Sequence, residues 1–146
     1  MTVWRFAATF FYLGNLPIAP GTWGSLGALI LWLFLPVTTS VHLSVILILF
    51  VLGVYSSQQV AKYMQVHDPS EVVIDEAVGM GISLFMLPHN FGLYLIAFIL
   101  FRFFDILKPT FIYQVQTLPG GWGIMLDDVL AGLFTLVIIS GISTLL

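Results

Sequence analysis

Apolar segments separated by short polar breaks dominate the pattern of this chain. Four of them occupy residues 25–36, 41–58, 91–107 and about 124–146, and the breaks are rich in Pro, Gly, Thr, Ser, His and Asn. Apolar runs of this kind, ended by Pro or by a polar turn, indicate helices with little need for a solvated face. The pattern therefore predicts an all-helical chain.

A fifth segment, residues 68–87, combines a helix-start signal with an apolar run. Asp68 is placed to be the N-cap, Pro69 takes the first helical position, and Glu71 follows at the third, which is a variant of the capping box. The run ends before Pro88. A helix of about 19 residues is ~28 Å long, close to the ~30 Å hydrocarbon core of a bilayer. We therefore predict a membrane-spanning helix here.

The amino-acid composition indicates that these helices belong to a membrane protein. Only 8% of the 146 residues are charged, 60% are hydrophobic, and the mean hydropathy is +1.08. So few charges cannot cover the surface of a soluble enzyme, and the chain has no basic patch for nucleic acid. The predicted fold is an all-α integral membrane protein with a single domain over residues 1–146. It is a compact bundle of about four transmembrane helices plus an N-terminal interfacial or re-entrant helix near residues 3–13.

The order of the helices divides the connections between two sides of the bilayer. The turns at 36–40 and 88–90 fall on one side, and the loops at 15–24, 59–68 and 108–123 fall on the other. All four Lys and Arg residues lie on the second side. The positive-inside tendency therefore predicts that the charged face is cytoplasmic.

The charged residues are concentrated rather than scattered. Nine of the eleven lie in three segments, residues 68–76, 102–108 and 127–128. A charge inside or against an apolar helix costs a few kcal/mol or more unless it is paired or hydrated. Concentration at that cost indicates a functional site. The alternative is a salt-bridge cluster that only holds the bundle together.

Acidic residues form two adjacent pairs, Asp75–Glu76 and Asp127–Asp128, with Asp105 as a fifth carboxylate. Hard oxygen ligands in a chain without cysteine favour Mg²⁺ over zinc or copper. The alternative is that acids in the first turn of a helix merely complement its dipole. That alternative suits Glu71 but not Asp75, which lies nearly two turns inside the helix predicted for 68–87.

Two cations flank a carboxylate in the second charged segment. Arg102, Asp105 and Lys108 are spaced by three, so they share adjacent parts of one helical face. Arg can clamp two phosphate oxygens and Lys acts as a point charge, although the three residues could also form a self-neutralising network. The loop containing Gly21 and Thr22 enters a helix and can offer backbone N–H groups to an anion, but such loops are also ordinary connections. Together these features indicate phosphoryl chemistry on a lipid headgroup.

The same motifs, taken in order, resemble the phosphatidylglycerophosphatase A family. The resemblance covers about residues 15–132 and rests on separate motifs in register: Ala19-Pro20-Gly21-Thr22-Trp23-Gly24-Ser25, Val66-His67-Asp68, Asp75-Glu76-x-x-Gly79-Met80, Phe101-Arg102-x-x-Asp105-x-x-Lys108-Pro109, and Gly120-Gly121-x-Gly123-Ile124-Met125-x-Asp127-Asp128-x-x-Ala131-Gly132. It implies a bacterial, Mg²⁺-dependent enzyme of the cytoplasmic (inner) membrane. Such an enzyme removes the terminal phosphate of phosphatidylglycerophosphate to give phosphatidylglycerol.

The resemblance also implies roles for individual residues. Asp75, Glu76, Asp127 and Asp128 are the expected metal ligands. Arg102, Asp105 and Lys108 are the expected catalytic residues, and Gly21 and Thr22, with Arg102 and Lys108, the expected phosphate-binding ones. Asp105 can serve as a further ligand, as a general base or as a nucleophile, and the sequence does not choose among these. Residues 110–117 are uncharged, where relatives often carry a basic residue and an acid, so headgroup recognition is expected to differ here.

A small cation- or proton-coupled transporter is the alternative function, because acids inside a membrane can form an ion path. Transport needs polar groups that lead through to the far side of the bilayer. The turns on that side hold only Thr, Ser, His and Asn. The distribution of charge therefore favours the phosphatase over the transporter.

Overall fold

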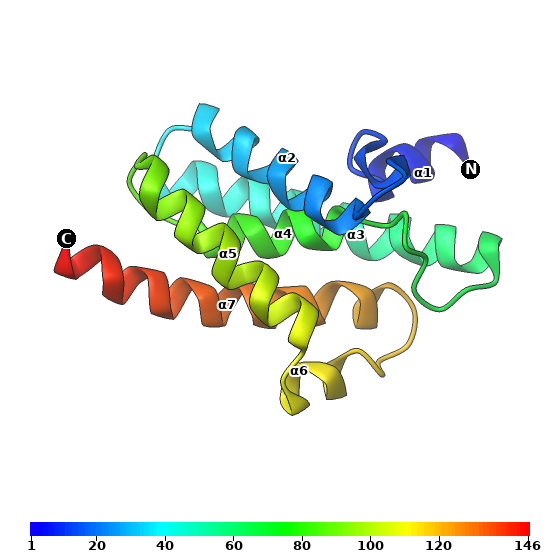
Figure 1. Cartoon of the computed structure of the whole chain (residues 1–146). Coiled ribbons are helices and arrows are strands. Elements are labelled where there is room, and N and C mark those ends of the chain that lie inside the picture. The colour runs from blue at the N-terminus through cyan, green and yellow to red at the C-terminus, as the bar shows by residue number, and fades with distance from the viewer.

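The computed structural model covers residues 1–146 and consists of helices and their connections, without strands. In chain order the helices are α1 (Thr2–Ala8), the 3-10 turn η1 (Leu13–Asn15), α2 (Pro20–Phe34), α3 (Thr39–Met64), α4 (Ile74–Ser83), α5 (Phe91–Leu107), α6 (Thr110–Val115) and α7 (Gly121–Leu145). Figure 1 shows α2, α3, α4, α5 and α7 running lengthwise as a bundle, with α1 and α6 on its outside. The prediction of an all-helical fold is confirmed.

Helix α5 has the bounds that its sequence pattern predicts. It begins after Asn90, whose side-chain Oδ1 accepts a hydrogen bond from the backbone N–H of Leu93 at 3.1 Å, an ordinary N-cap. It ends at Leu107, and the C-cap residue Lys108 adopts a left-handed conformation with φ of 43° just before Pro109. Both ends are therefore set by local chemistry.

The predicted helix over 68–87 is wrong in its length. Helix α4 occupies only Ile74–Ser83, and Asp68 is not its N-cap, since that position belongs to Val73 and has no side-chain cap. A contact distant in sequence replaces the expected first turns, because the backbone N–H of Val73 donates to the carbonyl of Ala8 at 2.9 Å. A ten-residue helix is about 15 Å long, too short to cross a bilayer.

Three smaller differences also concern helix bounds. Helix α2 begins at Pro20 rather than near residue 25, and α3 continues past residue 58 to Met64. The loop predicted for 108–123 contains the short helix α6. Each addition lies at the end of the bundle where the charged segments gather.

Helix α4 is the centre of the fold, and it packs most extensively against α7. Eight of its ten residues are buried. The two helices cross where Gly79 meets Gly132, because a Cβ atom added to Gly132 would lie 2.5 Å from the carbonyl oxygen of Gly79. The close approach of the two helices at this point therefore depends on the absence of side chains at these glycines.

The connections divide between the ends of the bundle as predicted. In Figure 1 the α2–α3 and α4–α5 turns and the C-terminus lie at one end, whereas α1, the α3–α4 loop and the α6–α7 loop lie toward the other. Helices α3 and α7, with 26 and 25 residues, have the length and hydropathy to cross a membrane. Helices α2 and α5 are shorter, so the expectation of about four spans is supported for two helices. Large apolar side chains point outward, including Phe34, Phe91 and Val137, each more than 70% exposed.

Candidate active site

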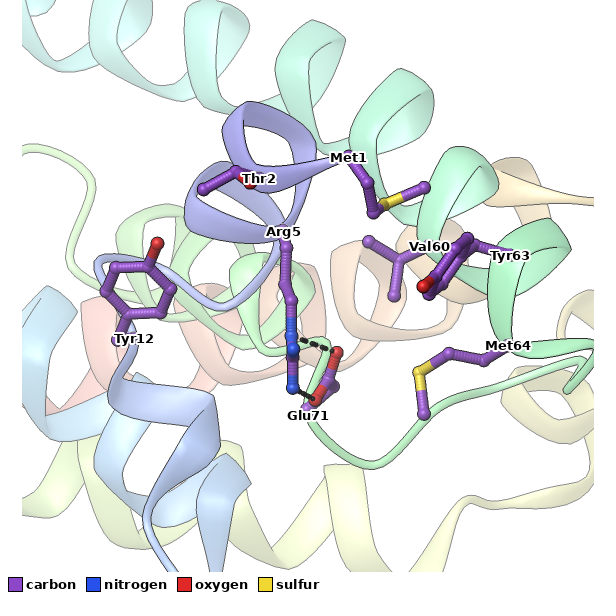
Figure 2. A pocket seen from close by; sticks show the side chains of 8 residues that line it. All are labelled: Met1, Thr2, Arg5, Tyr12, Val60, Tyr63, Met64 and Glu71. Carbon is purple, nitrogen blue, oxygen red and sulfur yellow. Dashed lines mark hydrogen bonds and ion pairs between the residues drawn. The ribbon is translucent and has the colours of Figure 1, made fainter.

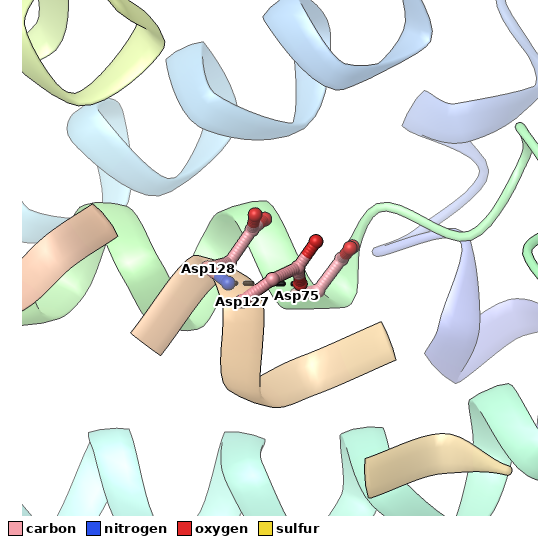
Figure 3. Close-up of side chains that lie close together, drawn as sticks. All are labelled: Asp75, Asp127 and Asp128. Atoms are coloured by element: carbon pink, nitrogen blue, oxygen red, sulfur yellow. Dashed lines mark hydrogen bonds between the residues drawn. The ribbon is translucent and has the colours of Figure 1, made fainter. Parts of the chain in front are cut away.

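Five carboxylates from three helices converge at one place in the bundle. Oxygens of Asp75, Asp127 and Asp128 lie within 4.8 Å of one another, and so do oxygens of Glu76, Asp105 and Asp128. Figure 3 shows Asp75 reaching from α4 toward the same region as Asp127 and Asp128 from α7. The four aspartates are each less than 9% exposed. The three charged segments predicted to share one face therefore share one cluster, which we call the acid cluster.

Each of two basic side chains is paired with one member of the acid cluster. The Lys108 ammonium donates to Asp127 Oδ2 at 2.8 Å, and Arg102 Nη1 donates to Asp105 Oδ2 one turn along α5. The self-neutralising network considered for residues 102–108 is therefore present only in part. Arg102 pairs with Asp105 within α5, as that network requires, whereas Lys108 pairs with Asp127 of α7 instead. Both pairs bring positive charge to the same end of α5.

The surroundings of Lys108 favour the charged form of its side chain. Its burial alone would lower the pKa of the ammonium, but the hydrogen bond and charge of Asp127, together with the charges of Asp128 and Asp105, raise the pKa above its ordinary value. The left-handed backbone at Lys108 ends α5 and turns the chain toward α6. Lys108 is therefore a fixed cation at the edge of the acid cluster.

A pocket of about 330 Å³ opens onto this cluster. Its walls include the start of α2 (Ala19, Pro20, Gly21), the loop before α4 (Asp68, Pro69, Ser70, Val72), and Asp75, Glu76, Arg102, Asp105, Lys108 and Asp128. A Cβ atom at Gly21 would lie 2.5 Å from Glu76 Oε1 and 3.1 Å from Arg102 Nη1, so the α2 backbone lies directly against these side chains. Thr22, the other residue predicted to bind phosphate from this loop, is not among the lining residues.

The loop before α4 is anchored from the N-terminal segment. Arg5 on α1 donates from Nε and Nη2 to the two carboxylate oxygens of Glu71, at 3.0 and 2.8 Å, and this pairing raises the pKa of the Arg5 guanidinium. Figure 2 shows the two side chains meeting in a second pocket, lined also by Tyr12 and Tyr63. The pair fixes the loop that carries Pro69, Ser70 and Val72 to the wall of the first pocket.

Comparison with known proteins places this arrangement in a family. The sequence model of the family described as Phosphatidylglycerophosphatase A matches residues 6–143. The chain belongs to the phosphatidylglycerophosphatase A family. No solved structure gives a significant match to it.

Three curated relatives of known name cover most of the chain. A phosphatidylglycerophosphatase A from Haemophilus influenzae is 42% identical over 92% of this chain and 85% of its own length. A phosphatidylglycerophosphatase A from Escherichia coli is 40% identical over 90% of this chain and 78% of its own length. A protein from Bacteroides thetaiotaomicron, provisionally named phosphatidylinositol-3-phosphatase, is 39% identical over 90% of this chain and 88% of its own length. The resemblance seen in the motifs is confirmed.

The structure of this family member brings together nearly all of the predicted site residues, and it changes one argument about them. Asp75 and Glu76 lie in the first turn of the shortened α4 rather than nearly two turns inside a helix. The dipole of α4 therefore does act on Asp75, contrary to the expectation from sequence. The dipole does not account for Asp127 and Asp128, which lie beyond the first turn of α7, or for Asp105 near the end of α5.

Sequence reasoning missed some of the pocket wall. Asp68 was assigned to a helix cap, but it lines the pocket and accepts a hydrogen bond from Gln116 at 3.4 Å. Ser70 and Val72 line it as well. The sequence signals for these residues are their position within the charged segment 68–76 and, for Asp68, the motif Val66-His67-Asp68, and neither distinguishes a wall residue from a cap.

Proposed function

We propose that this protein is a Mg²⁺-dependent lipid phosphatase that hydrolyses the terminal phosphomonoester of phosphatidylglycerophosphate to phosphatidylglycerol and phosphate. One observation carries the proposal: the acid cluster converges at one place, and four of its five carboxylates line a single pocket with Arg102 and Lys108, in a chain whose outer surface is largely apolar. The names of the two phosphatidylglycerophosphatase A relatives support the same substrate.

The acid cluster has the chemistry that a Mg²⁺ site requires. Asp75 Oδ1, Glu76 Oε2 and Asp128 Oδ2 are buried and have no hydrogen-bond partner. Buried anionic oxygens without partners are costly, and a hard divalent cation is a fitting partner for them. We assign Mg²⁺ binding to Asp75, Glu76, Asp127 and Asp128, as the family resemblance implies. Bound there, Mg²⁺ supplies Lewis acidity toward the phosphoryl group and helps to activate the attacking water.

The chain's own residues then bind and orient the phosphate. Arg102 has a buried Nε without a partner, so its guanidinium can donate to a phosphate oxygen while it keeps Asp105. Lys108 supplies a second fixed positive charge to the equatorial oxygens as charge develops. Gly21 at the start of α2 allows the phosphate to approach the backbone closely.

The reaction itself is a hydrolysis with a simple balance. The oxygen of water forms a bond to phosphorus, and the bond from phosphorus to the terminal glycerol oxygen breaks. A proton from the water ends on that glycerol oxygen, so the products are phosphatidylglycerol and inorganic phosphate. Asp105, paired with Arg102 in the pocket wall, lies close enough to the other carboxylates to take part in positioning the water.

We place the bundle in a bacterial cytoplasmic membrane with the acid cluster at the cytoplasmic face. Helices α3 and α7 are able to span it, and the outward apolar side chains suit lipid contact. The four basic residues lie toward the end of the bundle that holds the cluster, in agreement with the positive-inside tendency. No Asp, Glu, Lys or Arg lies between residues 25 and 61, between 77 and 101, or beyond 128, so no charged path leads to the far end, and this favours hydrolysis over transport.

The test is phosphate release by the full chain purified in detergent. We expect release from phosphatidylglycerophosphate with Mg²⁺ and none after chelation, with activity restored when Mg²⁺ is added back. Asp75→Asn is expected to abolish release without loss of helix content. Metal-independent release, or no release under conditions where a proven phosphatase is active, would contradict the proposal.

Phosphatidylinositol 3-phosphate is the second substrate to test, because one relative of 39% identity is named for that activity. Phosphatidic acid and a soluble phosphomonoester complete the comparison. We expect the highest kcat/KM for phosphatidylglycerophosphate. A higher kcat/KM for the inositol lipid would change the substrate and leave the metal-dependent phosphatase chemistry in place.

A further inference from the structure

Asp128 belongs to both groups of carboxylates in the acid cluster. One group is Asp75, Asp127 and Asp128, and the other is Glu76, Asp105 and Asp128. A carboxylate has two oxygens and can offer one to each of two neighbouring cations. We propose that the chain binds two divalent cations side by side and that Asp128 bridges them. This inference rests on the proposed metal requirement, and it adds Asp105 to the ligands.

Unpartnered oxygens occur in each group separately. Asp75 Oδ1 is buried without a partner in the first group, Glu76 Oε2 in the second, and Asp128 Oδ2 is common to both. Asp128 is 1% exposed and Asp75 is 7% exposed, so water is nearly excluded from both side chains. Asp75 and Glu76 belong to different groups, so a cation held by one group of three does not have the unpartnered oxygen of the other group among its ligands. The distribution of these atoms favours two ions.

The number of ligands points the same way. A protein site for one Mg²⁺ is usually built from one or two carboxylates, with water completing a small octahedron. Five converging carboxylates exceed that requirement. Divided into two groups with one shared member, they give each ion three carboxylates and leave further positions for water or for the phosphate.

Charge at the site gives a third argument. In the ionised form that binds a metal, the five carboxylates, together with the cations Arg102 and Lys108, leave three formal negative charges. One divalent ion would leave a net negative charge facing a phosphomonoester that is itself a dianion. A second ion makes the site positive before the substrate arrives, and this is the sign that an anion-binding pocket needs.

The experiment measures metal stoichiometry in the absence of substrate. The full chain in detergent is freed of metal with a chelator, and Mg²⁺ binding is followed by calorimetry. Mn²⁺ is then used as a spectroscopic probe, because two Mn²⁺ ions that share a bridging carboxylate give an exchange-coupled electron paramagnetic resonance signal. We expect two ions per chain and a coupled Mn²⁺ pair.

Single substitutions separate the two sites. Asp75→Asn and Glu76→Gln are each expected to retain one ion and to lose the coupled signal, and Asp128→Asn is expected to weaken both sites. Glu71→Gln is the matched control for Glu76→Gln, since Glu71 pairs with Arg5 outside the acid cluster, and it should bind two coupled ions. Retained helix content by circular dichroism accompanies each measurement.

The outcomes distinguish this inference from the proposed function. One ion per wild-type chain, or two ions without coupling, would overturn the bridge by Asp128, even if Mg²⁺-dependent phosphate release is observed. Two coupled ions in a protein that releases no phosphate would uphold the bridge and overturn the proposed function. If Asp128→Asn does not fold, the coupled Mn²⁺ signal of the wild type, together with its loss and the loss of one ion in Asp75→Asn and in Glu76→Gln, still tests the proposal.

Discussion

The crossing of α4 and α7 sets the geometry of the acid cluster, and Gly132→Ala perturbs that crossing directly. Gly132 lies one turn after Asp128 on α7. An added Cβ atom would lie 2.5 Å from the carbonyl oxygen of Gly79 and 3.1 Å from both the Cα of Gly79 and the Cβ of Ile82. Two of these three atoms are backbone, and the third is the branch point of a stiff side chain. No flexible side chain is available to absorb the methyl group.

The size of the expected effect follows from these distances. Ordinary contact begins at 3.4 Å, so α4 and α7 must separate locally by about 0.9 Å. Asp75 and Glu76 move with α4, whereas Asp127 and Asp128 move with α7, so every ligand separation across the crossing changes. Overpacking of this kind costs roughly 1–3 kcal/mol in stability. A displacement of about 1 Å in a catalytic constellation can lower the rate about 100-fold, and Mg²⁺ tolerates little departure from its octahedron.

Gly141→Ala provides the matched control on the same helix. No atom lies within 4 Å of a Cβ at Gly141, so this substitution adds the same methyl group without a clash. We expect Gly132→Ala to lose 10- to 100-fold in kcat for phosphatidylglycerophosphate and to bind Mg²⁺ more weakly, with Gly141→Ala near wild type. Phosphate release and calorimetry in the same detergent measure both. Equal kcat and equal Mg²⁺ affinity in the two variants would refute the reasoning.

Three further substitutions test the groups around the acid cluster. Lys108→Met removes the cation that pairs with Asp127, so kcat should fall about 100-fold. Mg²⁺ should bind at least as tightly as in the wild type, because the ammonium no longer competes for that carboxylate. Weaker Mg²⁺ binding would contradict this prediction. Arg102→Lys keeps the charge but loses the planar fork, and kcat/KM should fall about tenfold or more with metal stoichiometry unchanged. Arg5→Gln should lower the melting temperature only slightly, because the pair with Glu71 lies at the surface, and a large loss of Mg²⁺ binding in this variant would argue against that view.

The parts of the fold that local chemistry determines could be predicted from the sequence. Helix α5 has an Asn N-cap and ends just before Pro109, and its predicted and observed bounds agree. The gathering of charged segments at one end followed from helix order and turn length alone. The same reasoning could anticipate that Asp75, Asp105 and Asp128 approach one another, because it required only the succession of helices and turns.

The start of α4 could not be predicted, because a contact distant in sequence decides it. Asp68, Pro69 and Glu71 form a complete helix-start signal, yet Glu71 is engaged by Arg5, 66 residues earlier in the chain. The Val73 N–H is likewise taken by a carbonyl of the N-terminal segment. Tertiary contacts override a local propensity worth about 1 kcal/mol, and a single sequence does not reveal them.

The short α4 explains how so many acids can be buried in an apolar bundle. Because α4 begins at Ile74, Asp75 and Glu76 lie in its first turn, where the partial positive charge of the helix start favours carboxylates. Had the helix begun at Asp68, the same two residues would lie nearly two turns along it, beyond the reach of that effect. Helix α7 begins at Gly121 and places its acids deeper, and there Lys108 from α5 supplies the compensating charge to Asp127. The late start of α4 and the position of Lys108 at the end of α5 are therefore two solutions to one electrostatic problem, and the negative charge that remains is what the divalent cations of the proposed site would balance.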